Sequence, residues 1–137
     1  MFEKDKPKYA TQQIASSVSV EIHVLLWRIM DNRRNNQEPL DYLQVFHLQR
    51  NGDMQIITNK QEQPSMEKVV RLKLTESQPI DTTIWIIDDG SHCIMLFPND
   101  YWLEGKGMDT KQIVIIKKVV CAILAIALEE LSKKNRR

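Results

Sequence analysis

The sequence predicts a single α+β domain, in which a mostly antiparallel sheet of about five strands carries an N-terminal helix and a long C-terminal helix on one face. Three observations lead to this fold class. Apolar residues recur with helical spacing in residues 20–33, alternation with a period of two dominates between residues 42 and 97, and a long apolar stretch lies near the carboxyl terminus. The length of 137 residues suits one domain, with a core at residues 8–104 and a helical extension at residues 105–137.

The first predicted helix runs from Val20 to Arg33, after a polar lead-in. Ser17 or Ser19 can cap its start, and Glu21 in the first turn suits the helix dipole. A stretch rich in Asn and Gln that ends at Pro39 terminates the helix. Because only a narrow polar strip remains, the helix needs covering on more than one side.

Five strands follow from the alternating pattern and from the turns between them. They are Asp41–Leu48, Met54–Thr58, Val69–Leu74, Thr83–Ile87 and Cys93–Phe97. Asn51-Gly52-Asp53 is a hairpin turn between the first two strands, and Asp89-Gly90 is the turn between the last two. The nearly continuous apolar character of the last two strands predicts that they lie in the middle of the sheet.

The carboxyl-terminal segment is predicted to be a helix that starts near Asp109 and runs to about Lys134. The β-branched run Ile113–Ile116 leaves a second possibility open, a sixth strand before a shorter helix. The ten apolar residues Val119–Leu128 are too few to cross a membrane, so we expect no membrane partner. The helix would instead cover the first helix or provide the seam of a homodimer.

Composition and charge narrow the classes of function. A net charge of +1 gives no overall field that would attract nucleic acid, so nucleic acid is not an expected partner. The basic residues Arg33, Arg34, Arg71 and Lys73 could form a local patch, which keeps a nucleic-acid-binding accessory protein as a third alternative. The amino terminus has no apolar run of the secretory type, which favours a cytoplasmic location. Cys93 and Cys121 are expected to be free, buried thiols.

The polar tip of the last hairpin is the main candidate for chemistry. Asp88, Asp89, His92 and Cys93 are the residue types of a metal site or of an acid and base pair. However, Asp-Gly is ordinary turn chemistry, and alternation sends His92 and Cys93 to opposite faces. The sequence therefore predicts no catalytic residue, no cofactor and no metal ligand, and the protein is not expected to be an enzyme. A small hydrolase or metal-dependent enzyme that uses Asp88, Asp89 and His92 is the alternative.

The same tip can serve as a contact surface. Tyr101 and Trp102 are two large aromatic residues in a turn-rich link beside two glycines, and such aromatic residues are enriched at protein contacts. The candidate interaction surface consists of Asp88, Asp89, His92, Tyr101 and Trp102. We expect the protein to be a non-catalytic interaction or adaptor module for an unknown protein partner.

Several sequence stretches also resemble a known family. They are Leu26-Trp27, the segment Leu40–Phe46, the segment Ile84–Gly90, and Met95–Pro98 with Tyr101. Together they resemble a small domain of unknown function found in low-GC Gram-positive bacteria, their phages and staphylococcal chromosome cassettes, over roughly Lys8 to Tyr101. The resemblance implies a compact α+β domain and brings no activity or site residues. It also favours an interaction module, since small accessory proteins of mobile genetic elements often act by binding another protein.

Overall fold

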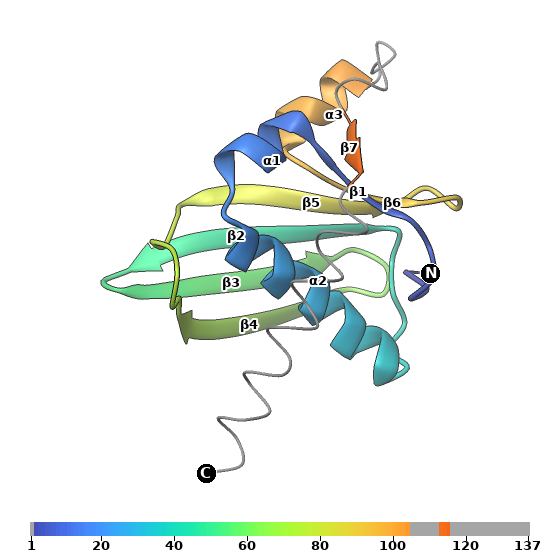
Figure 1. The fold of residues 1–137 in the computed structure, drawn as a ribbon. Coiled ribbons are helices and arrows are strands. Elements are labelled where there is room, and N and C mark those ends of the chain that lie inside the picture. The colour runs from blue at the N-terminus through green and yellow to red at the C-terminus, as the bar shows by residue number, and fades with distance from the viewer. Residues whose placement is uncertain (1, 105–112, 116–137) are drawn as a thin grey trace.

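The computed structural model describes residues 2–104 and 113–115. In this part of the chain, seven strands form one mixed sheet in the order β4-β3-β2-β5-β6-β1-β7, and three helices accompany it (Figure 1). The elements are β1 (Lys8–Thr11), α1 (Gln12–Ser17), α2 (Val20–Asn35), β2 (Leu43–Asn51), β3 (Met54–Gln61), β4 (Met66–Lys73), β5 (Thr82–Asp88), β6 (Cys93–Leu96), α3 (Pro98–Glu104) and β7 (Ile113–Ile115). Strands β1 and β6 run parallel, whereas the other neighbours run antiparallel.

Helix α2 crosses one face of the sheet and supplies much of the core (Figure 1). The Ser19 hydroxyl caps the helix by accepting a hydrogen bond from the Ile22 N–H at 3.3 Å. Further along the helix, Leu26 and Met30 are buried in one cluster with Phe46 of β2 and other strand residues. Since these apolar side chains recur every three to four residues, one stripe of the helix lies on the sheet, as the sequence predicts.

The start of α2 is also tied to the loop that follows β4. The Glu21 carboxylate accepts five hydrogen bonds of 2.7–3.0 Å from the backbone and hydroxyl groups of Thr75, Glu76 and Ser77. Burial raises the pKa of the Glu21 carboxyl, but these donors outweigh it and the pKa is lowered from its ordinary value. Glu21 therefore acts as a clamp between the helix and the loop.

We call the sheet surface turned away from α2 the open face. In β2, Gln44, Phe46 and Leu48 are buried toward the helix, and the residues between them are partly exposed on the other side. The open face mixes apolar with polar and charged side chains, which are Leu43, Val45, His47, Gln49, Met54, Ile56, Thr58, Lys60, Glu67, Val69, Arg71, Lys73, Thr83, Trp85 and Ile87. Within the described part of the chain, α2 is the one helix that crosses β2, β3 and β4, and it lies on the opposite face (Figure 1).

Much of the predicted fold is confirmed, including the α+β class, the first helix and all five predicted strands. The structure adds β1 and β7, and the parallel pairing of β1 with β6 makes the sheet mixed. It also adds the short helices α1 and α3, where the sequence predicted a polar lead-in and a link.

The predicted C-terminal helix is wrong at Ile113–Ile115, which form β7 and pair with β1, as the alternative of a sixth strand allowed. The rest of that helix, the homodimer seam, and Cys121 fall on residues 105–112 and 116–137, outside the described residues. Among the residues that the structure describes, no helix has the length and apolar character needed to cross a membrane.

Candidate functional site

The hairpin tip forms where the sequence places it, but Asp88 is not on the surface. This residue is 4% exposed. Its carboxylate accepts hydrogen bonds from the Phe2 N–H at 2.6 Å, the Gly90 N–H at 2.8 Å and the Lys6 ammonium group at 2.9–3.0 Å. Burial raises the pKa of this carboxyl, whereas the donors more than offset that effect and lower it. Asp88 thus anchors the amino-terminal segment to the end of β5, which corrects its predicted place on the contact surface.

Asp89 and His92 shape the loop itself. One oxygen of the Asp89 carboxylate accepts hydrogen bonds from the Ser91 N–H, the Ser91 hydroxyl and the His92 N–H at 2.8–3.0 Å, as in an Asx turn. Gly90 has a φ of +99°, a conformation that suits glycine. The loop is therefore fixed by its own side chains.

The arrangement of Ser91, His92 and Asp89 is not that of a catalytic triad. The Ser91 hydroxyl lies 2.9 Å from His92 Nδ1, and an Asp89 oxygen lies 3.1 Å from the same nitrogen. A triad needs the hydroxyl at one ring nitrogen and the carboxylate at the other, so that the ring can carry a proton between them. The His92 ring also packs edge-on against Tyr9, with 4.9 Å between the ring centroids.

Cys93 is buried, as the sequence predicts, with 1% of its surface exposed. Burial and the nearby Asp88 charge raise the pKa of its thiol to about 12, so the nucleophilic thiolate is scarce at neutral pH. In the described part of the chain, no group of three or more His, Cys, Asp and Glu side chains could hold a metal ion. The four polar residues of the tip therefore do not converge on a common centre.

The predicted aromatic pair lies in α3, which follows β6 directly. Tyr101 packs against Trp85 with their ring centroids 5.7 Å apart, and almost half of its surface remains exposed. Trp102 is in the same helix, and its side chain lies outside what the structure describes. Trp85 belongs to the open face, so Tyr101, which packs against it, lies at the margin of this face. Tyr9 pairs with Ile94 of β6, so His92, which packs against Tyr9, also lies at that margin.

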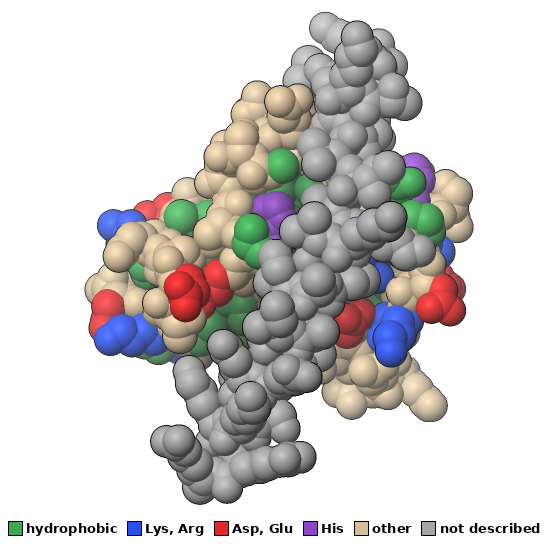
Figure 2. Space-filling view, viewed as in Figure 1, with side chains coloured by type: hydrophobic (Ala, Val, Ile, Leu, Met, Phe, Trp, Pro, Cys, Tyr) green, Lys and Arg blue, Asp and Glu red, His purple; other side chains and the backbone are tan. Residues whose placement is uncertain are grey.

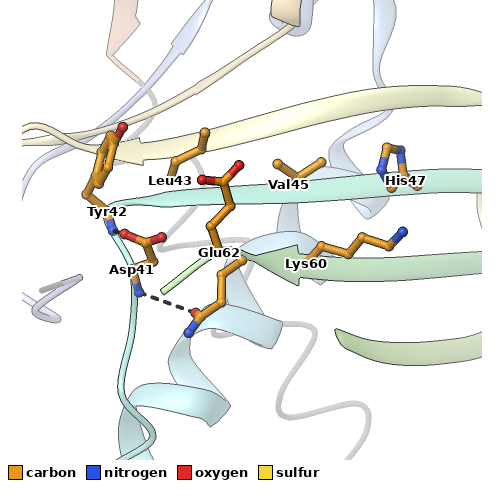
Figure 3. A pocket seen from close by; sticks show the side chains of 8 residues that line it. Asp41, Tyr42, Leu43, Val45, His47, Lys60 and Glu62 are labelled. Atoms are coloured by element: carbon orange, nitrogen blue, oxygen red, sulfur yellow. Dashed lines mark hydrogen bonds between the residues drawn. The ribbon is translucent and has the colours of Figure 1, made fainter. Parts of the chain in front are cut away.

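A pocket lies on the open face at the start of β2 and was not predicted (Figure 3). Its volume is about 250 Å³, and it is partly open to solvent. The lining residues come from β2, β3 and the segments beside them: Asp41, Tyr42, Leu43, Val45, His47, Lys60, Gln61 and Glu62. None of the hairpin-tip residues takes part in it.

The side chains of the pocket are ordered by chemistry along the strands. Figure 3 shows Leu43, Val45 and His47 in a row on β2, with the exposed ring of Tyr42 beyond one end. From β3, Lys60 extends toward the His47 end. Glu62, which follows β3, reaches over β2 close to Leu43. The pocket thus has an apolar floor, an aromatic and acidic end, and a basic end.

Lys60 and Glu62 are charged groups with no role in the fold that the structure records. Within residues 2–104 and 113–115, neither side chain makes a hydrogen bond or an ion pair. Asp41, by contrast, is engaged, since its carboxylate accepts hydrogen bonds from the Tyr42 and Gln63 N–H groups. Among the described residues, therefore, nothing competes with a ligand for Lys60 and Glu62.

A buried polar network lies behind the pocket and centres on Arg33, which is 2% exposed. The guanidinium group donates hydrogen bonds to the side-chain oxygens of Gln44, Asn59 and Gln61 at 2.6–2.8 Å, and to Glu38 at 3.4 Å. Burial lowers the pKa of Arg33, against the opposing effect of Glu38. Arg33 is consequently unavailable for the basic patch that its sequence position suggested.

The network also holds the loops that carry the pocket residues. The Gln61 side chain donates hydrogen bonds to the Pro39 and Pro64 carbonyl groups at 3.0 and 2.9 Å, and its oxygen accepts one from the Asp41 N–H at 3.3 Å. These contacts fix the entry to β2 and the exit from β3, where Tyr42 and Glu62 lie. One sequence signal could have revealed this network. The apolar alternation of β2 and β3 places amide side chains at inward positions, namely Gln44, Asn59 and Gln61.

Charges of both signs are interspersed on the coloured part of the surface seen from the α2 side (Figure 2). Several charges of the described residues are paired, such as Lys68 with Glu38 and Arg34 with Asp31. This mixture agrees with the net charge of +1 and gives that part of the surface no patch of a single sign.

Comparisons with known proteins place the chain among proteins of unknown function. A crystal structure of a protein of unknown function from Enterococcus faecalis is similar, with a TM-score of 0.65 and 27% sequence identity, and the match covers 72% of this chain and 93% of that chain. A comparison with curated proteins finds no match. The model of a family described as staphylococcal protein of unknown function (DUF960) matches residues 7–100, nearly the stretch over which the sequence resembles such a family. The chain therefore belongs to this staphylococcal family of unknown function.

Proposed function

We propose that the protein is a non-catalytic interaction module that binds a protein partner through the open face. One observation carries this proposal: the open face exposes apolar side chains, with Val69 45% exposed, and the pocket on it has the 53% exposed ring of Tyr42 at one end. Apolar and aromatic side chains exposed among polar ones are typical of non-obligate protein contact sites. The margin of the face carries His92 and Tyr101 from the predicted contact surface.

The hairpin tip supports this function better than it supports catalysis. The carboxylates of Asp88 and Asp89 are occupied by backbone and side-chain donors, and the Cys93 thiol is buried. A general acid or base needs a free position facing a substrate. The family resemblance adds a setting, the accessory proteins of mobile genetic elements in Gram-positive bacteria.

The test uses two neighbouring valines of the edge strand β4. Val69 pairs with Thr58 and belongs to the open face, whereas Val70 pairs with Ile57 and belongs to the α2 side. They are 45% and 37% exposed, so glutamate at either position has a similar cost for folding. Immobilised parent, Val69→Glu and Val70→Glu proteins are incubated with a staphylococcal lysate, and the retained proteins are identified by mass spectrometry.

We expect a partner that the parent and Val70→Glu retain and that Val69→Glu loses, because a carboxylate on the open face would have to be desolvated in the contact. Equal thermal stability of the two variants provides the control. Equal retention by both variants would refute binding through this face. If the parent retains no protein beyond the bare matrix, the interaction function itself is contradicted.

A further inference from the structure

The pocket on the open face has charges of opposite sign at its two ends. Glu62 reaches over Leu43 at the end of the pocket where Tyr42 also lies, and an exposed aromatic ring and a carboxylate at one end favour a cation, through the ring face and through an ion pair. Lys60 extends to the His47 end, where a donor group favours a carboxylate. Between them Leu43 and Val45 offer an apolar floor. A complementary ligand is therefore cationic at one end, apolar in the middle and anionic at the other.

The spacing of these groups matches an extended polypeptide. From Leu43 to His47 there are four residue steps, which correspond to about 13 Å at about 3.3 Å per step. An extended peptide that lies along β2 presents the side chains of its first, third and fifth residues on one side over the same length. The pocket is open and continuous with the open face, so it suits a segment of a larger partner more than an enclosed small molecule.

We infer that this pocket binds an extended peptide segment that carries a Lys or Arg, an apolar residue and an Asp or Glu at alternate positions. The inference rests on the proposed function and specifies the segment of the partner that the open face receives. The cationic side chain lies between Tyr42 and Glu62, the apolar side chain rests on Val45, and the acidic side chain meets Lys60. The Arg33 network behind the pocket holds the loops in place before the peptide arrives.

The test titrates the full-length, ¹⁵N-labelled protein with capped synthetic peptides and follows amide chemical shifts. The probe is acetyl-Arg-Thr-Val-Thr-Glu-amide. Three comparison peptides carry, at its first and fifth positions, two Gln residues, two Arg residues or two Glu residues. We expect shifts at residues 42–47 and 60–62, with the uncharged peptide about tenfold weaker, since each exposed ion pair contributes about 2- to 5-fold. The difference should shrink in 0.5 M salt.

Charge reversal gives the decisive result. Lys60→Glu should reverse the preference in favour of the peptide with two Arg residues, and Glu62→Lys should favour the peptide with two Glu residues. Lys73→Glu is the matched control, because it makes the same change of charge on the open-face side of β4, outside the pocket. It should leave the preference for the mixed peptide unchanged.

Two outcomes would overturn the inference: amide shifts that avoid the pocket residues, or a peptide preference that Lys60→Glu and Lys73→Glu alter equally. Neither outcome depends on the identity of the natural partner. If the peptides fail while Val69→Glu still abolishes retention of a partner, the pocket inference is wrong and the open-face function stands. If Val69→Glu changes nothing, the proposed function fails on its own test.

Discussion

Replacing Arg33 by Met tests the buried network that supports the pocket. In the folded protein the guanidinium group donates to three amide oxygens, and it is almost completely removed from solvent. Methionine has a similar length and removes all of these donors together with the charge. The loss in free energy of unfolding depends on which of the three amide oxygens keeps a hydrogen bond from another donor.

The contacts allow the loss to be estimated. The Gln44 oxygen keeps a hydrogen bond from Asn59 at 3.2 Å, and the Gln61 oxygen keeps one from Gln44 at 2.8 Å. The Asn59 oxygen loses its one recorded donor, and a buried acceptor without a partner costs about 1–3 kcal/mol. Imperfect filling of the space that the guanidinium leaves adds about 1 kcal/mol. We expect Arg33→Met to lower the free energy of unfolding by about 2–4 kcal/mol.

Urea denaturation followed by tryptophan fluorescence measures this change, since Trp27 lies in the core on α2, the helix that also carries Arg33. Arg28→Met is the matched control on the same helix, because Arg28 makes no hydrogen bond or ion pair with the described residues. It should cost less than about 0.5 kcal/mol. The double variant Arg33→Met with Asn59→Leu should recover part of the loss. If Arg33→Met unfolds within 1 kcal/mol of the parent, the network does not stabilise the fold as described.

Three further predictions concern the anchors Asp88 and Glu21 and the buried thiol of Cys93. Asp88→Asn should lower the free energy of unfolding by about 2–3 kcal/mol, and hydrogen exchange should show lost protection in residues 2–8. Glu21→Gln should lower it by about 1–2 kcal/mol at pH 7. Because the pKa of Glu21 is lowered in the folded protein, this difference should shrink as the pH falls below 4.5 in urea titrations at several pH values. In a Cys121→Ser background, the folded protein's Cys93 should react with an aromatic disulfide reagent at pH 8 about 10³-fold more slowly than the same thiol in urea. The reason is that the thiol pKa is about 12 in the folded protein and 9.0 in the unfolded chain, so far less thiolate is present. A rate like that of the unfolded chain would contradict the burial of Cys93.

The sequence predicts those parts of the fold that depend on local patterns. Helix α2 begins at Val20, after the Ser19 cap, because capping and helical periodicity both act over a few residues. The hairpin of β5 and β6 forms because two apolar runs flank a glycine that must adopt a positive φ, here +99°. Such signals are complete within about fifteen residues, so they can be recognised without the tertiary structure.

Strand β1 could not be recognised in this way. It has four residues, and its partner β6 lies more than eighty positions further along the chain in a parallel pairing. Parallel pairs have no connecting turn whose residue types mark them, and four residues show too little alternation to stand out. Strand β7 is shorter still, and its β-branched residues also fit an apolar helix.

The buried charged residues illustrate a different limit. Asp88 and Arg33 have charged side chains that are typical of surfaces, yet both are buried because distant partners satisfy them. For Asp88 the partners are in the amino-terminal segment, and for Arg33 they are in β2 and β3. No local pattern encodes such pairing, so charge alone assigned both residues to the surface.

The pocket follows from the same long-range arrangement. Lys60 and Val45 come from strands that a hairpin aligns, and their register places the ammonium group beside the apolar row of β2. Gln61, between Lys60 and Glu62, points the other way into the Arg33 network, because successive residues of a strand alternate between faces. One short segment thus fixes the loops through its inward side chain and presents two opposite charges through its outward ones. This division of roles explains why the open face is a better candidate than the hairpin tip, whose polar groups are used in holding the tip together.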